Sequence, residues 1–320
     1  MKTSPLTATD LRGSVLAVPP MPRQVDGSID ADANRRVLDH LRAGRVSTFM
    51  YGGNANFYNI GVAELGRVLD VLTPLLAAGD WLIPAVGADF GKAAEQIALL
   101  RERAFPTAMV LPLRFPATAA GAASGIGKLA ARYGKPVIAY VKDEGYIHNG
   151  DLAALVKDGS VCAVKYAIVR HDPRQDAVLA DLVQRMGPDL VISGIGERPV
   201  LDHFRGFGLR AFTSGSTCVA PALSNRIREA LHAGDFATAS ATRELFIPLE
   251  DMRDAYSPIR ILHAAVQLAG IAPTGPIGEF LSVIEDKQVL DKLKGIALEL
   301  LARNQAALAR PQEKREVARY

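Results

Sequence analysis

Apolar runs of strand length alternate with amphipathic segments of helical period along the first 235 residues of the chain. A strand buried on both faces is a nearly continuous apolar run, whereas an amphipathic helix repeats its apolar residues every three or four positions. The pattern predicts strands at residues 14–18, 46–50, 81–86, 108–111, 136–141, 161–169, 190–194 and 210–215. A helix is expected after each strand, at residues 30–43, 62–78, 90–102, 117–133, 151–157, 173–186, 198–204 and 220–232.

The strict alternation of strands and helices predicts a parallel sheet and the α/β class. Eight such units in this length fit a closed (β/α)8 barrel, or TIM barrel, which usually takes about 250 residues. The competing fold, an open doubly wound sheet, normally carries a glycine fingerprint after its first strand. Here the first strand runs into Pro19 and Pro20 instead. We therefore predict a (β/α)8 barrel over residues 1–235.

Beyond residue 235 only helical patterns follow, at residues 236–249, 258–268, 280–284 and 289–308. They predict a C-terminal helical bundle over residues 236–310, packed on the barrel or on a neighbouring subunit. Residues 311–320 are mostly charged and contain Pro311, so a mobile tail is expected there.

Composition narrows the class of protein. The chain has 320 residues, of which 49% are hydrophobic, and its net charge of +3 is too small to indicate a nucleic acid or an anionic membrane as partner. The only two cysteines, Cys162 and Cys218, lie in apolar surroundings and are expected to be reduced thiols. The first residues lack the apolar region of a signal peptide, and no run of about 18 apolar residues occurs. A cytoplasmic protein is expected.

One lysine interrupts an otherwise apolar strand. Lys165 stands in the run Val-Cys-Ala-Val-Lys-Tyr-Ala-Ile-Val at residues 161–169. Burial disfavours the charged ammonium and lowers the pKa of a lysine, which yields the free amine that attacks carbonyl groups. The alternative is that Lys165 lies at the strand end and extends its ammonium group to solvent.

Active sites of such barrels form at the C-terminal ends of the strands. The polar or glycine positions that meet this rule are Gly52, Gly53, Asn54, Arg114, Tyr140, Lys165, Tyr166, Ser193, Gly194, Glu197, Thr213, Ser214 and Gly215. A nucleophilic amine, a phenol and glycine N–H groups suit Schiff-base chemistry. The iminium stabilises a neighbouring carbanion, the phenol transfers protons, and the N–H groups hold a carboxylate.

Two segments on consecutive strands, Ile-Ala-Tyr at residues 138–140 and Ala-Val-Lys at residues 163–165, carry a tyrosine and then a lysine. In this respect the chain resembles the dihydrodipicolinate synthase/N-acetylneuraminate lyase family of class I aldolases. Residues 190–194, 214–216 and 257–259 look like further segments of that family, and the resemblance spans about residues 13–284. It implies that Lys165 forms the Schiff base and that Tyr140 transfers protons. It also implies that the chemistry needs no cofactor. In addition, it implies that the chain forms a homo-oligomer, either a tetramer or a dimer.

Three segments depart from the family pattern. Residues 52–56 read Gly-Gly-Asn-Ala-Asn, where the family has a Gly-Thr-Thr-Gly-Glu-type loop that grips the carboxylate. Leu113-Arg114-Phe115 stands where the synthases have a second tyrosine, and residues 141–145 replace a segment with a substrate-binding arginine. We therefore expect a different, sugar-derived 2-keto acid. Backbone N–H groups and the Asn54 amide replace the lost hydroxyls, and Arg114 or Lys142 meets a distal group.

These observations predict a Schiff-base-forming lyase (aldolase, dehydratase or synthase) that acts on pyruvate or a related 2-keto acid, with no metal. The candidate residues are Lys165 and Tyr140 for catalysis, and Gly52, Gly53, Asn54, Arg114, Ser193, Gly194 and Ser214 for substrate binding. The alternative is a keto-acid or sugar-acid binding homologue without turnover. A metal-dependent aldolase is a weaker alternative, because the six histidines form no H-x-H or H-E-x-x-H motif. Four purely structural interpretations also remain: Tyr140 as a strand aromatic, the glycine pair as a tight turn, Gly194 and Gly215 as packing glycines, and Arg114 as a structural or surface cation.

Overall fold

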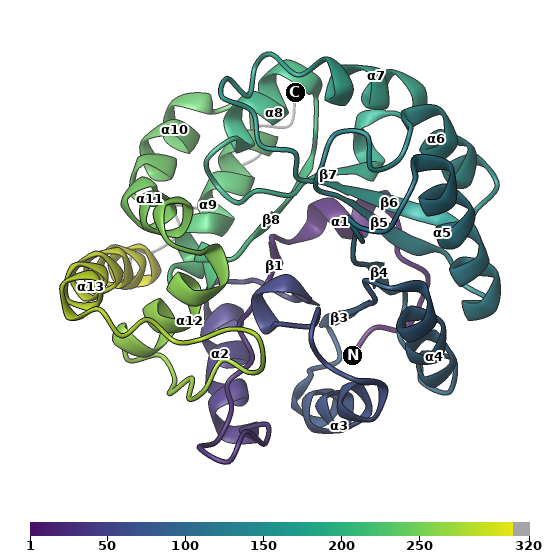
Figure 1. The fold of residues 1–320 in the computed structure, drawn as a ribbon. Coiled ribbons are helices and arrows are strands. Elements are labelled where there is room, and N and C mark those ends of the chain that lie inside the picture. Colours follow the sequence, from purple (N-terminus) through teal and green to yellow (C-terminus); the bar gives the residue numbers. More distant parts are fainter. Residues whose placement is uncertain (310–320) are drawn as a thin grey trace.

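The computed structural model describes residues 1–309. Eight parallel strands close into a barrel in sequence order, and β1 pairs with both β2 and β8 (Figure 1). The strands are β1 (Leu16–Ala17), β2 (Thr48–Tyr51), β3 (Trp81–Val86), β4 (Met109–Val110), β5 (Val137–Val141), β6 (Val161–Tyr166), β7 (Val191–Ser193) and β8 (Ala211–Ser214). The predicted (β/α)8 barrel is confirmed. Its strands are continuous apolar runs because one face fills the barrel and the other contacts the helices.

A helix follows each strand and packs on the outside of the barrel, as the helical periodicity predicted. These helices are α2 (Ala31–Ala43), α3 (Val62–Leu72), α4 (Phe90–Arg101), α5 (Ala119–Tyr133), α6 (Asn149–Lys157), α7 (Ala177–Met186), α8 (Val200–Phe207) and α9 (Pro221–His232). Short 3₁₀ turns also occur: η1 (Gly53–Ala55), η2 (Thr73–Leu75), η3 (Pro188–Leu190) and η4 (Ser216–Cys218). The sequence reading missed the first helix, α1 (Ala8–Gly13), whose first turn is held by a capping box between Thr7 and Asp10.

Four helices follow the barrel: α10 (Phe236–Glu244), α11 (Ile247–Ala255), α12 (Pro258–Leu268) and α13 (Lys287–Ala309). The prediction of one helix over residues 236–249 was wrong. The chain restarts at α11 with Pro248 in the first turn, where the missing N–H of proline costs no hydrogen bond. The helix predicted at 280–284 was also wrong, because Gly278 and Phe280 adopt φ values of 89° and 59°. The expected mobile tail, residues 311–320, lies outside the described residues.

The four C-terminal helices gather on one side of the barrel, next to α9 (Figure 1). Helix α12 contacts both η1 and η4, the turns that follow β2 and β8. The extension therefore reaches the mouth of the barrel, where its side chains can contribute to a site. The division of the chain at residue 235 into two units stays a prediction. In the part of the chain described, no helix has both the length and the apolar character needed to cross a membrane.

Candidate active site

Lys165 and Tyr140 face each other at the mouth of the barrel. They are direct partners in the ladder between β5 and β6. The Lys165 Nζ atom lies 4.3 Å from the centre of the Tyr140 ring. Both side chains are buried, Lys165 with 4% of its surface exposed, and both line a cavity of about 240 Å³. The strand pairing thus brings together an amine and a phenol that are 25 residues apart in sequence.

The electrostatic surroundings of Lys165 favour the neutral amine. No carboxylate among residues 1–309 forms an ion pair with it. Burial lowers the pKa of Lys165 to about 7, and the positive charges of Lys142 and Arg253 contribute to the lowering. Burial also raises the pKa of Tyr140 to about 12. At neutral pH a substantial part of the amine is therefore free, while the phenol keeps its proton.

Gly194 lets the end of β7 pass close to the lysine strand. A Cβ atom at this position would lie 2.6 Å from the Tyr166 carbonyl oxygen and 3.0 Å from Cγ of Lys165. The Gly194 N–H donates a 2.7 Å hydrogen bond to that same carbonyl. No side chain fits there, so this glycine packs directly against the stem of Lys165 and lines the cavity.

Of the other predicted binding residues, Gly53 and Asn54 line the cavity. The Asn54 amide is held by a 2.8 Å hydrogen bond from Nδ2 to the Val18 carbonyl oxygen. Gly52 lies deeper in the barrel, where a Cβ atom would lie 2.8 Å from Cε of Met109. Of the three residues predicted in the loop after β2, Gly53 and Asn54 therefore line the cavity and Gly52 does not.

Besides Gly52, three predicted binding residues do not line this cavity. Ser193 Oγ lies 2.8 Å from Nδ1 of the buried His203, on the helix side of β7. Ser214 Oγ donates a 2.8 Å hydrogen bond to Glu197 Oε2. The Arg114 side chain is 71% exposed and pairs with Asp143. The geometry gives no support to a substrate contact from these residues, because their polar atoms are engaged elsewhere.

The cavity contains three charged residues and one tyrosine that the sequence reading did not select. The helix α11 contributes Glu250, Arg253 and Asp254, and the turn after β2 contributes Tyr58. The sequence did carry a signal: Glu250 and Arg253 alternate along α11 with the buried Leu249 and Met252, on a face that must pack against the barrel. Buried charged residues in such a pattern indicate a partner or a site.

A buried polar network supports this wall of the cavity. Arg253 Nη1 donates a 2.9 Å hydrogen bond to Glu250 Oε1, which also accepts from the Ser216 hydroxyl. Next to it, Glu197 accepts from the hydroxyls of Ser214 and Ser224. Burial and the nearby Glu250 raise the pKa of Glu197. The network fixes the orientation of the Arg253 guanidinium group.

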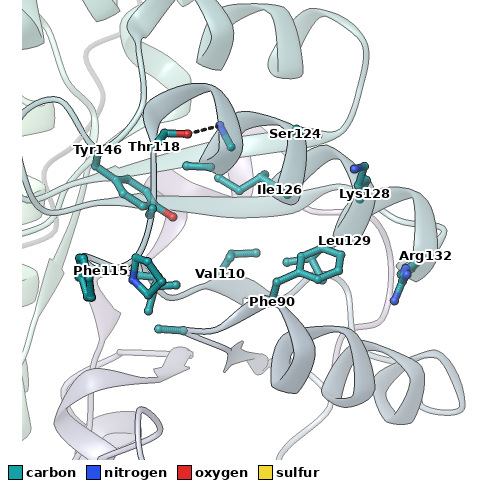
Figure 2. Close-up of a pocket in the computed structure, with 17 residues that line it drawn as sticks. Phe90, Val110, Phe115, Thr118, Ser124, Ile126, Lys128, Leu129, Arg132 and Tyr146 are labelled. Atoms are coloured by element: carbon teal, nitrogen blue, oxygen red, sulfur yellow. Dashed lines mark hydrogen bonds between the residues drawn. The ribbon is translucent and has the colours of Figure 1, made fainter.

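A larger cavity lies away from Lys165. It measures about 880 Å³ and lies along α4 and α5, with Phe90, Phe115, Ile126 and Tyr146 in its wall (Figure 2). Neither Lys165 nor Tyr140 lines it. The residues that can do covalent chemistry therefore lie in the smaller cavity at the barrel mouth. Within residues 1–309, no group of three or more His, Cys, Asp or Glu side chains is placed to hold a metal ion.

The fold and this cavity define a (β/α)8 barrel with a buried lysine beside a tyrosine at its catalytic end. No model of a protein family matches the sequence. The chain is 25% identical over 275 residues to probable 5-dehydro-4-deoxyglucarate dehydratase 2 of Streptomyces coelicolor, which covers 83% of each chain. It is 25% identical over 285 residues to probable 5-dehydro-4-deoxyglucarate dehydratase of Rhizobium meliloti, covering 84% of this chain and 90% of that protein.

Solved structures share the whole fold. Dihydrodipicolinate synthase from Bacillus clausii superposes with a TM-score of 0.78 at 20% identity, over 93% of this chain and 99% of that one. Sialic acid aldolase from Ruminococcus gnavus gives a TM-score of 0.77 at 14% identity, over 91% and 99%. With the sequence matches, these likenesses confirm the resemblance of the chain to the dihydrodipicolinate synthase/N-acetylneuraminate lyase family. The predicted enzyme class, a lyase, is confirmed as well.

Proposed function

We propose that the chain is a Schiff-base-forming lyase in which Lys165 attacks the keto group of a 2-keto acid. The observation that carries the proposal is the buried Lys165 amine, facing Tyr140 across 4.3 Å at the barrel mouth. The pKa of about 7 leaves roughly half of this lysine as free amine at neutral pH. An ordinary exposed lysine is almost fully protonated at that pH.

The reaction follows from these two groups. The Lys165 nitrogen adds to the carbonyl carbon, and the resulting hydroxyl leaves as water once it receives a proton, which the Tyr140 phenol is placed to supply. The iminium then draws electrons from the neighbouring carbon, whose proton is removed to give an enamine. In a dehydration, the enamine expels the hydroxyl of the next carbon as water. In a retro-aldol reaction, the iminium instead takes up the electrons of the next carbon–carbon bond, which breaks to give the enamine while the hydroxyl beyond it loses its proton and becomes a carbonyl.

We propose a sugar-derived 2-keto acid, rather than an amino-acid precursor, as the substrate. Proteins named as 5-dehydro-4-deoxyglucarate dehydratases are similar over more than four-fifths of the chain. Lys142 and Arg253 line the cavity beside Lys165, together with the carboxylates of Glu250 and Asp254, and the two further cations suit an acid with more than one anionic or polar group. We therefore favour dehydration over condensation. Gly53, Asn54 and Gly194 are the proposed binding residues of the predicted set.

Proton exchange tests the chemistry without knowledge of the true substrate. Pyruvate and other 2-keto acids, including 5-dehydro-4-deoxyglucarate, are incubated with the protein in D₂O, and exchange next to the carbonyl is followed by proton NMR. Enamine formation predicts exchange that depends on Lys165. Equal exchange by Lys165→Met protein would overturn the proposal, and the exposed Lys157→Met serves as the matched control.

The second candidate is a binding protein that has lost turnover, and the rebuilt loop at Gly53 and Asn54 is the observation that favours it. It predicts that 2-keto acids raise the melting temperature without exchange or product. Turnover that is lost in Lys165→Met protein would exclude it.

We also propose a homo-oligomer, a dimer or tetramer. The apolar wall of the large cavity ends in Phe115, which is 85% exposed and is suited to cover by another subunit (Figure 2). Sedimentation of the wild-type and Phe115→Lys proteins tests this, since a lysine at the contact is expected to shift the distribution toward monomer. We place the protein in the cytoplasm, in agreement with its free thiols Cys162 and Cys218.

A further inference from the structure

Two side-chain nitrogens from distant parts of the chain converge above one glycine at the barrel mouth. A Cβ atom on Gly215 would lie 2.7 Å from Asn54 Nδ2 and 2.9 Å from Arg253 Nη2. Asn54 belongs to the turn after β2, Gly215 follows β8, and Arg253 lies on α11. Because both distances are measured to a single point, the two nitrogens are close enough to bind one ligand group together. All three residues line the cavity that contains Lys165.

Both nitrogens keep hydrogen-bonding capacity. The Arg253 side chain is only 10% exposed, and its Nη1 and Nε atoms are engaged by Glu250, Ser216 and the Pro258 carbonyl oxygen. Its Nη2 atom has no hydrogen-bond partner within the described part of the chain. Asn54 Nδ2 donates one hydrogen to the Val18 carbonyl oxygen, which leaves its second hydrogen. Since Arg253 and Asn54 both line the cavity, these two donors are available there to an anionic ligand.

The guanidinium group is held in place before any ligand binds. The pair with Glu250, supported by Ser216, fixes its plane, so little side-chain entropy is lost on binding. Gly215 has no side chain, and this lets the Asn54 amide and the Arg253 guanidinium group approach the same point. Planar N–H donors at a dry, fixed position match the two oxygens of a carboxylate.

We propose that Arg253 and Asn54 together bind the carboxylate attached to the keto carbon of the substrate, and that Gly215 allows the two side chains to converge. This inference rests on the proposed function and names the group that replaces the two hydroxyls missing from the loop after β2. Lys142, which follows β5 on the other side of the mouth, remains for a second polar or anionic group. The residue that selects for an acid thus comes from the helical extension and not from the barrel.

Borohydride trapping with two small ketones tests the assignment. The rate of covalent trapping is measured against the concentration of pyruvate, and separately of hydroxyacetone, a neutral ketone without the carboxylate. The variants are Arg253→Met/Glu250→Gln, which removes the ion pair without leaving an unpaired buried charge, and Gly215→Ala. The exposed ion pair of α13 provides the matched control, Arg303→Met/Glu299→Gln.

For both site variants we expect the half-saturating concentration of pyruvate to rise about 10- to 100-fold, the range of one charge-assisted hydrogen bond. Trapping of hydroxyacetone is expected to change less than threefold, and the control variant to match wild type. An unchanged half-saturation for pyruvate would overturn the inference. So would an equal change for both ketones, which would mean that Arg253 acts only through folding or through the pKa of Lys165.

Failure of the proposed function gives a different result, namely no trapping of either ketone by the wild-type protein. Pyruvate binding is then measured by calorimetry, which needs no covalent step. Weaker binding by Arg253→Met/Glu250→Gln than by wild type supports the carboxylate site, and equal binding or no binding to wild type overturns it.

Discussion

Replacing Lys165 by methionine should make the folded protein more stable at neutral pH. Methionine keeps most of the volume of the lysine stem but removes a group that must lose its proton, or remain charged without a carboxylate partner, in order to be buried. A stabilising substitution of the proposed nucleophile would be typical of an active site, where function is maintained at the expense of stability.

The magnitude follows from the pKa of Lys165, which burial lowers from the ordinary 10.5 to about 7. Between these two pH values the unfolded chain binds a proton at this position that the folded chain does not, so the stability of the wild type rises with pH. Because one pKa unit corresponds to about 1.4 kcal/mol, the penalty is on the order of 4 kcal/mol at pH 7 and about 1 kcal/mol at pH 9.5. The advantage of Lys165→Met should shrink accordingly.

Urea unfolding at pH 7 and pH 9.5, at one protein concentration, measures this difference. The exposed Lys157→Met on α6 is the matched control, and its stability relative to wild type is expected to be independent of pH. The reasoning fails if Lys165→Met is no more stable than wild type at pH 7, or if its advantage does not decrease with rising pH.

Three further predictions follow from the geometry of the site. The rate of adduct formation should rise with pH through about 7. Lys142→Met should move this rise to higher pH, because it removes a positive charge that lowers the pKa of Lys165. An unchanged pH profile in this variant would contradict the prediction. Tyr140→Phe should slow formation of the borohydride-trapped adduct by about 10²- to 10⁴-fold, because the phenol supplies the proton with which water leaves, and an unchanged trapping rate would remove the phenol from the mechanism. Gly194→Ala should destabilise the protein by about 1–3 kcal/mol in urea titrations, because its Cβ would lie 2.6 Å from a backbone oxygen. The control Gly150→Ala on α6 should not destabilise it. Equal stability of the two variants would argue against the close approach at Gly194.

The barrel could be predicted from the sequence, because the period of the apolar residues and the length of each apolar run distinguish a strand from a helix. It was also sufficient to bring Lys165 next to Tyr140, since consecutive strands of a barrel are neighbours and both residues stand late in their strands. The breaks in the C-terminal part were harder to predict. Pro248 starts a new helix, and the backbone around Gly278 and Phe280 turns in a way that the apolar pattern does not encode.

The cavity wall could be predicted only in part from the sequence. Whether a serine near a strand end faces the cavity depends on the residue at which the strand ends, and Ser193 and Ser214 direct their hydroxyls to His203 and Glu197 instead. Arg253 escaped selection because it lies outside the barrel pattern. Its place at the mouth depends on how α11 and α12 pack, a long-range contact that no local periodicity specifies.

The most direct measurement is covalent trapping at Lys165. The protein is incubated with a panel of 2-keto acids and reduced with borohydride, and its peptides are mapped by mass spectrometry. We predict one adduct per chain, on the peptide that contains Lys165, with no adduct in the Lys165→Met protein. Absence of an adduct with every acid of the panel, or its location on another lysine such as Lys142, would contradict the central claim.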